Sequence, residues 1–183
     1  CLIVQRMVFS EGGIMTTVDV LKRAFLFESL SQTQIEEIAQ LGQEKNFRVG
    51  EEIIKQGNRA ETVHILLNGR ISVRVKDNEE TDLMAKTLQL PGAVFGTVAL
   101  VEPYVYNVTA EAVSEATTFA IEAFRLAETM RANSVVGFEI MSSLCRSYLH
   151  RLNVKRTGMI SLYKLFRAQS HKAEIYDTYR DVA

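Results

Sequence analysis

The chain has 183 residues, a length typical of one domain with an appended helix. Its residues are 47% hydrophobic and 23% charged, with only 2 prolines, which excludes a disordered, collagen-like or low-complexity protein. The 2 cysteines are too few for a disulfide scaffold or a cysteine-rich zinc site. No apolar run reaches the roughly 18 residues of a membrane span, so we expect a reducing, cytoplasmic setting without membrane contact.

The net charge of −1 combines two unequal parts. Residues 141–183 carry eight Lys/Arg against three Asp/Glu, a net charge of +5, so residues 1–140 carry −6. Between Lys86 and Arg125 there is no basic residue. An anion site inside that stretch therefore lacks a cation from its own neighbourhood in the sequence.

The N-terminal part divides into a leader and two short helices. Residues 1–15 begin apolar but have no small-residue cleavage site, so we interpret them as a cloning remnant or a mobile leader. From residue 17 to 43 the apolar spacing is helical and predicts two short helices joined at 29–31. Ser31 and Gln34 form a capping-box pair, which predicts the start of the second helix.

From residue 47 to about 122 short Val-, Ile- and Thr-rich runs alternate with turn residues, which predicts an antiparallel β barrel or roll. The strongest hairpin signal is Asn68–Gly69, because both residues tolerate a positive φ angle. The expected strands cover residues 52–54, 63–67, 71–75, 84–88, 110–113 and 117–121, and the turns lie near residues 50, 57–58, 68–69, 77–78 and 91–92.

The helical period returns after residue 123. A short amphipathic helix is expected over 124–132, and a long helix begins near Ser134. Steps of three and four along the long helix predict a seam that pairs with a second copy of the chain. The seam residues are Phe138, Met141, Cys145, Tyr148, Leu152, Lys155, Met159, Leu162 and Phe166. The alternative is packing on the chain's own barrel through a second apolar flank, formed by Ile140, Leu144 and Leu149. Gly158 is a weak point within this helix and a place for a bend.

Residues 90–100 read Leu-Pro-Gly-Ala-Val-Phe-Gly-Thr-Val-Ala-Leu. Gly96 allows the backbone to approach a ligand closely, and residues 97–100 can form one helical turn with free amides. Backbone amides at a helix start attract anions, so this segment is a candidate anion site.

From about residue 26 to 152 the sequence resembles the cyclic nucleotide-binding domain family, which includes catabolite-activator/FNR-like regulators, kinase regulatory subunits and channel gating domains. The matching segments are 26–31, 47–57, 65–73 and 91–100, with glycines at five separate turns. The resemblance implies a mainly β fold with flanking helices: an antiparallel, jelly-roll-like β roll with N-terminal helices and a long C-terminal dimerisation helix. It also implies a phosphate cassette formed here by Phe95, Gly96, Thr97, Val98, Ala99, Leu100, Tyr106 and Asn107.

In that family the cassette holds a glutamate for the ribose hydroxyl and an arginine for the cyclic phosphate. Here the glutamate position holds Thr97, and the arginine position falls at Tyr106 or Asn107. Each charge-assisted hydrogen bond contributes roughly 1.5–3 kcal/mol, so loss of the arginine weakens binding by about two orders of magnitude. The sequence therefore predicts a degenerate cassette that does not bind cyclic AMP or cyclic GMP in the usual way.

Two further features bear on a ligand. Lys155 and Arg156 lie where related activators contact the purine from the long helix, although Lys155 also suits a register-setting seam position. Tyr104 and Tyr106 offer aromatic surface, but tyrosines in β loops more often serve packing.

No catalytic constellation or metal site is expected. The three histidines, His64, His150 and His171, are too scattered to bind a metal, and His64 is interpreted as a hydrogen-bonded barrel residue. A seam thiol at Cys145 is interpreted as a small hydrophobic residue.

About 17 residues follow Phe166, too few for a helix-turn-helix domain, so we expect no DNA binding by this chain. The expected domains are a leader (1–15), a β-roll domain (16–132) and a dimerisation helix with its tail (133–183). We predict a non-enzymatic, homodimeric regulatory or sensor module. The alternatives are a genuine cyclic-nucleotide-responsive regulator, the sensor half of a DNA-binding regulator, and an interaction scaffold with a vestigial pocket.

Overall fold

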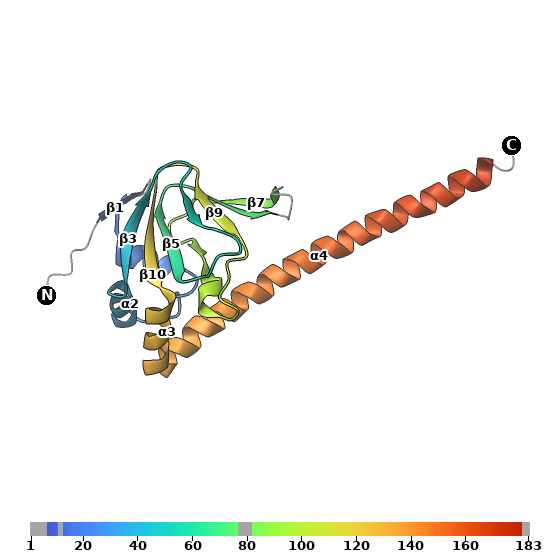
Figure 1. Ribbon diagram of the computed structural model, residues 1–183. Coiled ribbons are helices and arrows are strands. Elements are labelled where there is room, and N and C mark those ends of the chain that lie inside the picture. The colour runs from blue at the N-terminus through green and yellow to red at the C-terminus, as the bar shows by residue number, and fades with distance from the viewer. Residues whose placement is uncertain (1–6, 11–12, 77–81, 181–183) are drawn as a thin grey trace. The chain divides into compact units, whose positions relative to one another are not determined.

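The structure, a computed structural model, describes the backbone of residues 7–10, 13–76 and 82–180 (Figure 1). The chain forms two compact units, residues 1–144 and residues 145–183. The first unit holds all the strands and the short helices, and the second continues the long C-terminal helix.

The first unit begins with a hairpin and two short helices. Strands β1 (Met7–Ser10) and β2 (Gly13–Thr16) pair antiparallel within the segment interpreted as a leader. Helix α1 (Thr17–Arg23) is capped by Thr16 and helix α2 (Gln32–Ala39) by Ser31. The Ser31–Gln34 capping box is present in both directions, as predicted. The link between the helices is longer than expected, since residues 24–30 form turns that bury Leu26 and Phe27.

Two four-stranded antiparallel sheets follow, with the orders β3-β10-β5-β8 and β4-β9-β6-β7 (Figure 1). They confirm the predicted β roll with N-terminal helices and a long C-terminal helix. The strands are β3 (Gly42–Phe47), β4 (Glu52–Ile54), β5 (Thr62–Asn68), β6 (Ile71–Lys76), β7 (Asp82–Leu88), β8 (Val94–Phe95), β9 (Thr109–Ala112) and β10 (Ala116–Glu122). The 3₁₀ turn η1 (Thr97–Leu100) lies between β8 and β9.

Two strands differ from the sequence prediction. The sequence predicts helical structure up to residue 43. In the structure Gly42–Phe47 is strand β3, which pairs with β10 along its whole length. Its alternation is polar and weak, so tertiary pairing decides its conformation. The short strand β8 arises because Val94 and Phe95 pair with Ile65 and His64 of β5.

The predicted hairpin at Asn68–Gly69 is wrong. Strand β5 pairs with β10 and β8, whereas β6 pairs with β7 and β9, so the chain passes from one sheet to the other at this turn. Gly69 has a φ angle of 90° and lies against the backbone of Glu115 and Ala116, where a side chain has no room. The turn predicted at Asp77–Asn78 lies outside the described residues.

Helices α3 (Ala123–Ala132) and α4 (Ser134–Arg180) follow the last strand, near the predicted boundaries. Within the first unit, α4 buries Val136, Ile140 and Leu144 in the core, so the second apolar flank does pack on the chain's own domain. Leu149, the third residue expected on that flank, is instead 60% exposed. The helix is continuous through Gly158. Among the residues the structure describes, no helix has the length and apolar character needed to cross a membrane.

Candidate functional site

The cassette segment forms a sharp turn between β8 and η1. Gly96 caps η1 in the left-handed region, with a φ angle of 76°. A Cβ atom at Gly96 would lie 2.7 Å from the carbonyl oxygen of Thr62 at the start of β5. The glycine expected for close approach to a ligand is therefore required for close approach to the neighbouring strand.

The turn predicted over residues 97–100 is present, as the 3₁₀ turn η1. The amide of Ala99 donates to the carbonyl of Gly96, at 3.1 Å. Phe95, Thr97 and Ala99 are buried, whereas Val98 and Leu100 are half-buried against the core. Most of the predicted cassette thus forms a packed wall of the domain.

Tyr106, which follows the cassette turn in the sequence, packs beside Gly96. Its side chain is only 6% exposed, and one ring carbon would lie 3.5 Å from a Cβ atom at Gly96. The Tyr106 hydroxyl accepts a hydrogen bond from the Thr62 amide at 3.1 Å and donates one to the Thr62 carbonyl at 2.9 Å. The structure therefore brings Tyr106 and the cassette turn together on the first residue of β5, while Asn107 is exposed.

His64 lies behind the cassette on β5. Its ring stacks on Phe95 with centroids 5.0 Å apart, and its Nδ1 is 3.0 Å from the hydroxyl of Thr118. These contacts confirm the interpretation of His64 as a hydrogen-bonded barrel residue. Burial, assisted by the nearby charge of Lys45, lowers the pKa of His64 to about 4, so the imidazole is neutral near pH 7.

A charged pair that the sequence did not reveal lies on the second sheet. The guanidinium of Arg74 on β6 binds the carboxylate of Glu111 on β9, and both side chains are partly buried. The two residues are 37 positions apart, so only the pairing of β6 with β9 brings them together.

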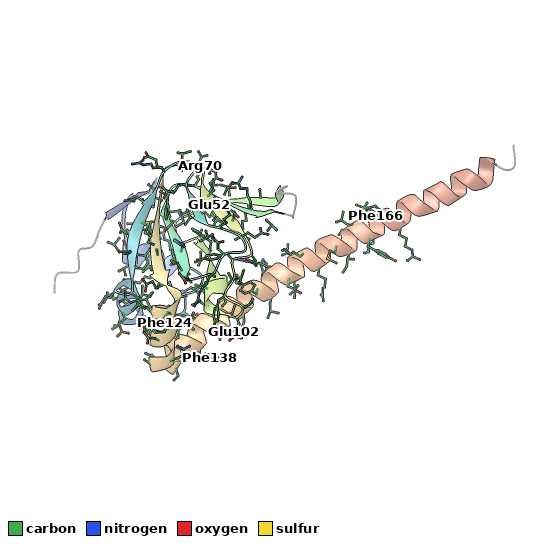
Figure 2. The ribbon with its side chains drawn as sticks, in the orientation of Figure 1. Glu52, Arg70, Glu102, Phe124, Phe138 and Phe166 are labelled. Atoms are coloured by element: carbon green, nitrogen blue, oxygen red, sulfur yellow. The ribbon has the colours of Figure 1, made fainter. Side chains whose placement is uncertain are left out.

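The predicted helix contacts lie in the second unit. Lys155 and Arg156 are exposed on α4, and their expected contact with the cassette stays a prediction. Phe138, in the first unit, is 70% exposed, whereas the seam residue Met141 packs against the core. Among the later seam residues, Tyr148 is 36% exposed, and the others are more than half exposed, namely Leu152, Met159, Leu162 and Phe166. Cys145 is an exposed free thiol, and Figure 2 shows Phe166 projecting from α4.

Within the described part of the chain, no group of three or more His, Cys, Asp or Glu side chains gathers to bind a metal ion. The groups around the cassette are aromatic rings, hydroxyls and backbone amide and carbonyl groups. This chemistry suits the recognition of a small molecule or the packing of a core.

Comparison with known proteins places this geometry in context. Residues 44–133 match the family model of the cyclic nucleotide-binding domain. No curated protein matches the chain.

Several solved structures share the fold. The N-terminal domain of a transcriptional regulator from Streptomyces coelicolor A3(2) is 19% identical with a TM-score of 0.64, covering 72% of this chain and 94% of that one. A protein from Geobacter metallireducens GS-15, named as a candidate cyclic nucleotide-binding protein, is 28% identical with a TM-score of 0.62, covering 75% and 99%. The catabolite activator protein of Thermus thermophilus is 18% identical with a TM-score of 0.64, covering 72% of this chain and 61% of that one.

Proposed function

We propose, from the premise that residues 44–133 form a cyclic nucleotide-binding domain, that this protein is a homodimeric regulatory module whose cassette does not hold a cyclic nucleotide in the usual way. Domains of this family regulate and are generally not enzymes. Two parts of the proposal go beyond the family: the state of the cassette and the role of the long helix.

The observation that carries the first part is the position of Tyr106. Both hydrogen-bonding roles of its hydroxyl are taken by the backbone of Thr62, and its ring is buried beside Gly96. A side chain held in this way fills space next to the cassette turn and has no charge to offer a phosphate. Tyr106 therefore favours a pocket occupied by the protein's own side chain.

Charge supports the same conclusion. A buried phosphate without a cationic partner is costly, because desolvation of the anion is not offset. The sequence has no Lys or Arg from residue 87 to 124, and Thr97 stands where the family has a glutamate. The loss of an arginine contact worth roughly 3 kcal/mol or more weakens binding by about a hundredfold.

The fold alone does not imply control by cyclic AMP. A related structure is a mutant of the regulatory subunit of a protein kinase A from Trypanosoma brucei that is described as cAMP-independent, with cAMP bound in the A site of that mutant. It is 18% identical to this chain, with a TM-score of 0.61, and covers 71% of this chain and 45% of that one. The same architecture thus occurs in a protein described as independent of cyclic AMP.

The long helix supports a homodimer. Leu152, Met159 and Leu162 repeat at heptad spacing, and each is more than half exposed in the single chain. Exposed apolar side chains at this spacing are stabilised by pairing with an equivalent helix, which removes their surface from water. We infer that the described part of α4 beyond residue 144 is the dimer interface.

Isothermal titration with cyclic AMP and cyclic GMP tests the state of the cassette. We expect no binding by the wild-type protein at micromolar concentrations. The double variant Thr97→Glu/Tyr106→Arg reinstates both missing groups and should gain affinity, whereas the matched control Tyr106→Phe removes the hydroxyl without adding charge and should not. Micromolar affinity of the wild-type protein would contradict the proposal.

Analytical ultracentrifugation tests the interface. Leu152→Glu introduces a charge at a seam position and should shift the protein to monomer. Val154→Glu is the matched control, because Val154 is 58% exposed, close to the 63% of Leu152, but lies off the seam. A dimer that survives Leu152→Glu, or one lost equally in both variants, would contradict the assignment.

A second candidate function is an interaction scaffold whose pocket is vestigial. The buried Tyr106 favours it, because its ring takes up space beside Gly96 that a ligand at the cassette turn would need. The two functions differ in one measurement: a sensor changes its dimer affinity when a small molecule binds, whereas a scaffold keeps the same dimer affinity with and without such molecules.

A further inference from the structure

A groove of about 610 Å³ lies on the first unit, and two cassette residues, Ala99 and Leu100, form part of its lining. It is lined by one end of β3 and β10, the segment before β5, the end of η1 and helix α3. We call this feature the basic groove. Its volume is within the range of specific binding sites in proteins, about 300–1,000 Å³.

The floor of the basic groove consists of small side chains. Gly42 and Ala120 come from neighbouring strands, Ala99 from η1, and Ala123 and Ala127 from α3. The alanine side chains are short, so this part of the lining can contact a larger apolar side chain from outside. The burial of such a side chain is favourable at roughly 25 cal/mol per Å² of apolar surface.

The walls carry positive charge. Lys45, Arg59, Arg125 and Arg131 line the groove, against the two carboxylates Glu61 and Glu122. Residues 1–140 as a whole are acidic, with a net charge of −6. The groove thus reverses the charge of the domain that carries it.

Existing contacts leave much of this charge available. Arg59 forms an exposed ion pair with Glu61 at 3.2 Å, and one Arg125 nitrogen donates to the carbonyl of Leu41 at 3.0 Å. Because the carbonyl of Leu41 is neutral, this hydrogen bond does not compensate the positive charge of Arg125. Lys45 on β3 and Arg131 on α3 are both exposed and both line the groove.

An aromatic side chain stands beside the charges. Phe124, on α3 and labelled in Figure 2, is 67% exposed, and Tyr104, which also lines the groove, is 42% exposed. Exposed aromatic and arginine side chains around a depression are the residues that most often dominate the binding energy of protein interfaces.

We propose that the basic groove docks an acidic segment of a partner protein, which places an apolar side chain on the alanine floor and its carboxylates against Lys45 and Arg131. Two observations favour this occupant. The lining has four basic residues against two carboxylates, which favours an acidic occupant, and the basic excess of residues 141–183 disfavours the long helix of a second copy.

Fluorescence anisotropy with a labelled peptide tests the proposal on the full chain. The probe is a short peptide of glutamate and alanine with one central phenylalanine, and the control probe replaces each glutamate by lysine. We expect saturable binding of the acidic probe that weakens as salt is added, and no binding of the lysine probe. Backbone amide shifts of Gly42, Ala99 and Ala127 in NMR spectra should respond to the acidic probe.

The charge-reversed variant Lys45→Glu/Arg131→Glu should weaken acidic-probe binding by about tenfold or more. The matched control is Arg48→Glu/Arg70→Glu, which reverses two exposed arginines outside the groove and should change affinity by less than about twofold. In Figure 2, Arg70 and Phe124 lie at opposite ends of the first unit.

Three results would overturn the proposal: no binding of the acidic probe, equal binding by both charge-reversed variants, or displacement of the probe by inorganic phosphate alone. The last result would identify a small-anion site instead. The outcome is distinguishable from that of the cyclic-nucleotide titration, because Lys45 and Arg131 line the groove but do not belong to the cassette, whereas Thr97 and Tyr106 do not line the groove.

Discussion

Lowering the pH from about 7.5 to about 5 should destabilise the folded protein through His64 on β5. The imidazole is 3% exposed, stacked on Phe95, and bonded to the hydroxyl of Thr118. Burial, with a smaller contribution from Lys45, lowers its pKa from 6.5 to about 4. In the unfolded chain the imidazole returns to its ordinary pKa and binds a proton more readily.

The sign follows from proton binding. Between pH 6.5 and about 4 the unfolded chain binds the proton and the folded protein does not, so stability rises with pH in this window. The contribution of His64 is therefore fully present above pH 6.5 and is lost as the pH falls toward 4. At about 1.4 kcal/mol per pH unit the full loss is about 3 kcal/mol, of which about 2 kcal/mol is lost by about pH 5.

Urea unfolding at a fixed protein concentration measures this effect, since dimerisation makes stability depend on concentration. The variant His64→Gln keeps an amide that can bond to Thr118 but has no group that titrates. Its free energy of unfolding should change by about 2 kcal/mol less than that of the wild-type protein between the two pH values. Equal losses in both proteins would refute the reasoning.

Asp19 does not contribute in this window. The pKa of Asp19 is lowered from 3.8, first by a hydrogen bond from the side chain of Thr16 and then by one from its backbone. The stability held by that carboxylate is present above pH 3.8 and is lost only below it. The comparison between about pH 7.5 and about pH 5 therefore contains no contribution from Asp19, and the His64→Gln variant isolates the contribution of His64.

Three further substitutions test the packing in thermal unfolding experiments. Gly96→Ala should lower the free energy of unfolding by about 2 kcal/mol or more, because the position has a positive φ angle and the added Cβ atom would lie 2.7 Å from the Thr62 oxygen. Gly50→Ala is the control and should lower it less, because Gly50 has a similar φ angle but no neighbour within 4 Å. Gly158→Ala should stabilise α4 by about 1 kcal/mol and raise its helical circular dichroism, because no atom obstructs the added methyl group. Ser143→Ala should raise the melting temperature slightly, since the Ser143 hydroxyl is buried without a hydrogen-bond partner in the described structure; a clear fall would mean that the hydroxyl has a partner.

Local sequence signals predicted most of the elements. The capping box at Ser31 set the start of α2, and the β-branched runs set the positions of β5, β6 and β10 within one or two residues. These features depend on neighbours within a few positions, so the sequence displays them directly. Strand β3 was missed because its residues have no strong preference and adopt a strand only by pairing with β10.

The site was predictable in part. The glycine at position 96 and the turn after it were visible as a pattern, and the absence of a basic residue from 87 to 124 was visible as a count. The role of Tyr106 was not, because its partner Thr62 lies 44 residues away. A phenol and a backbone amide at that separation leave no periodic signal.

The sequence by itself determined the class of fold, the apolar seam of the long helix and the unequal charge of the two parts of the chain. Tertiary structure decided the direction of the chain at Gly69, the hydrogen bonds of Tyr106 to Thr62 and the presence of Lys45 and Arg131 in the lining of one groove. The physical reason is the range of the interactions. Capping, periodicity and turn preference act over a few residues, whereas a groove is a relation between residues that only sheet pairing and core packing bring together.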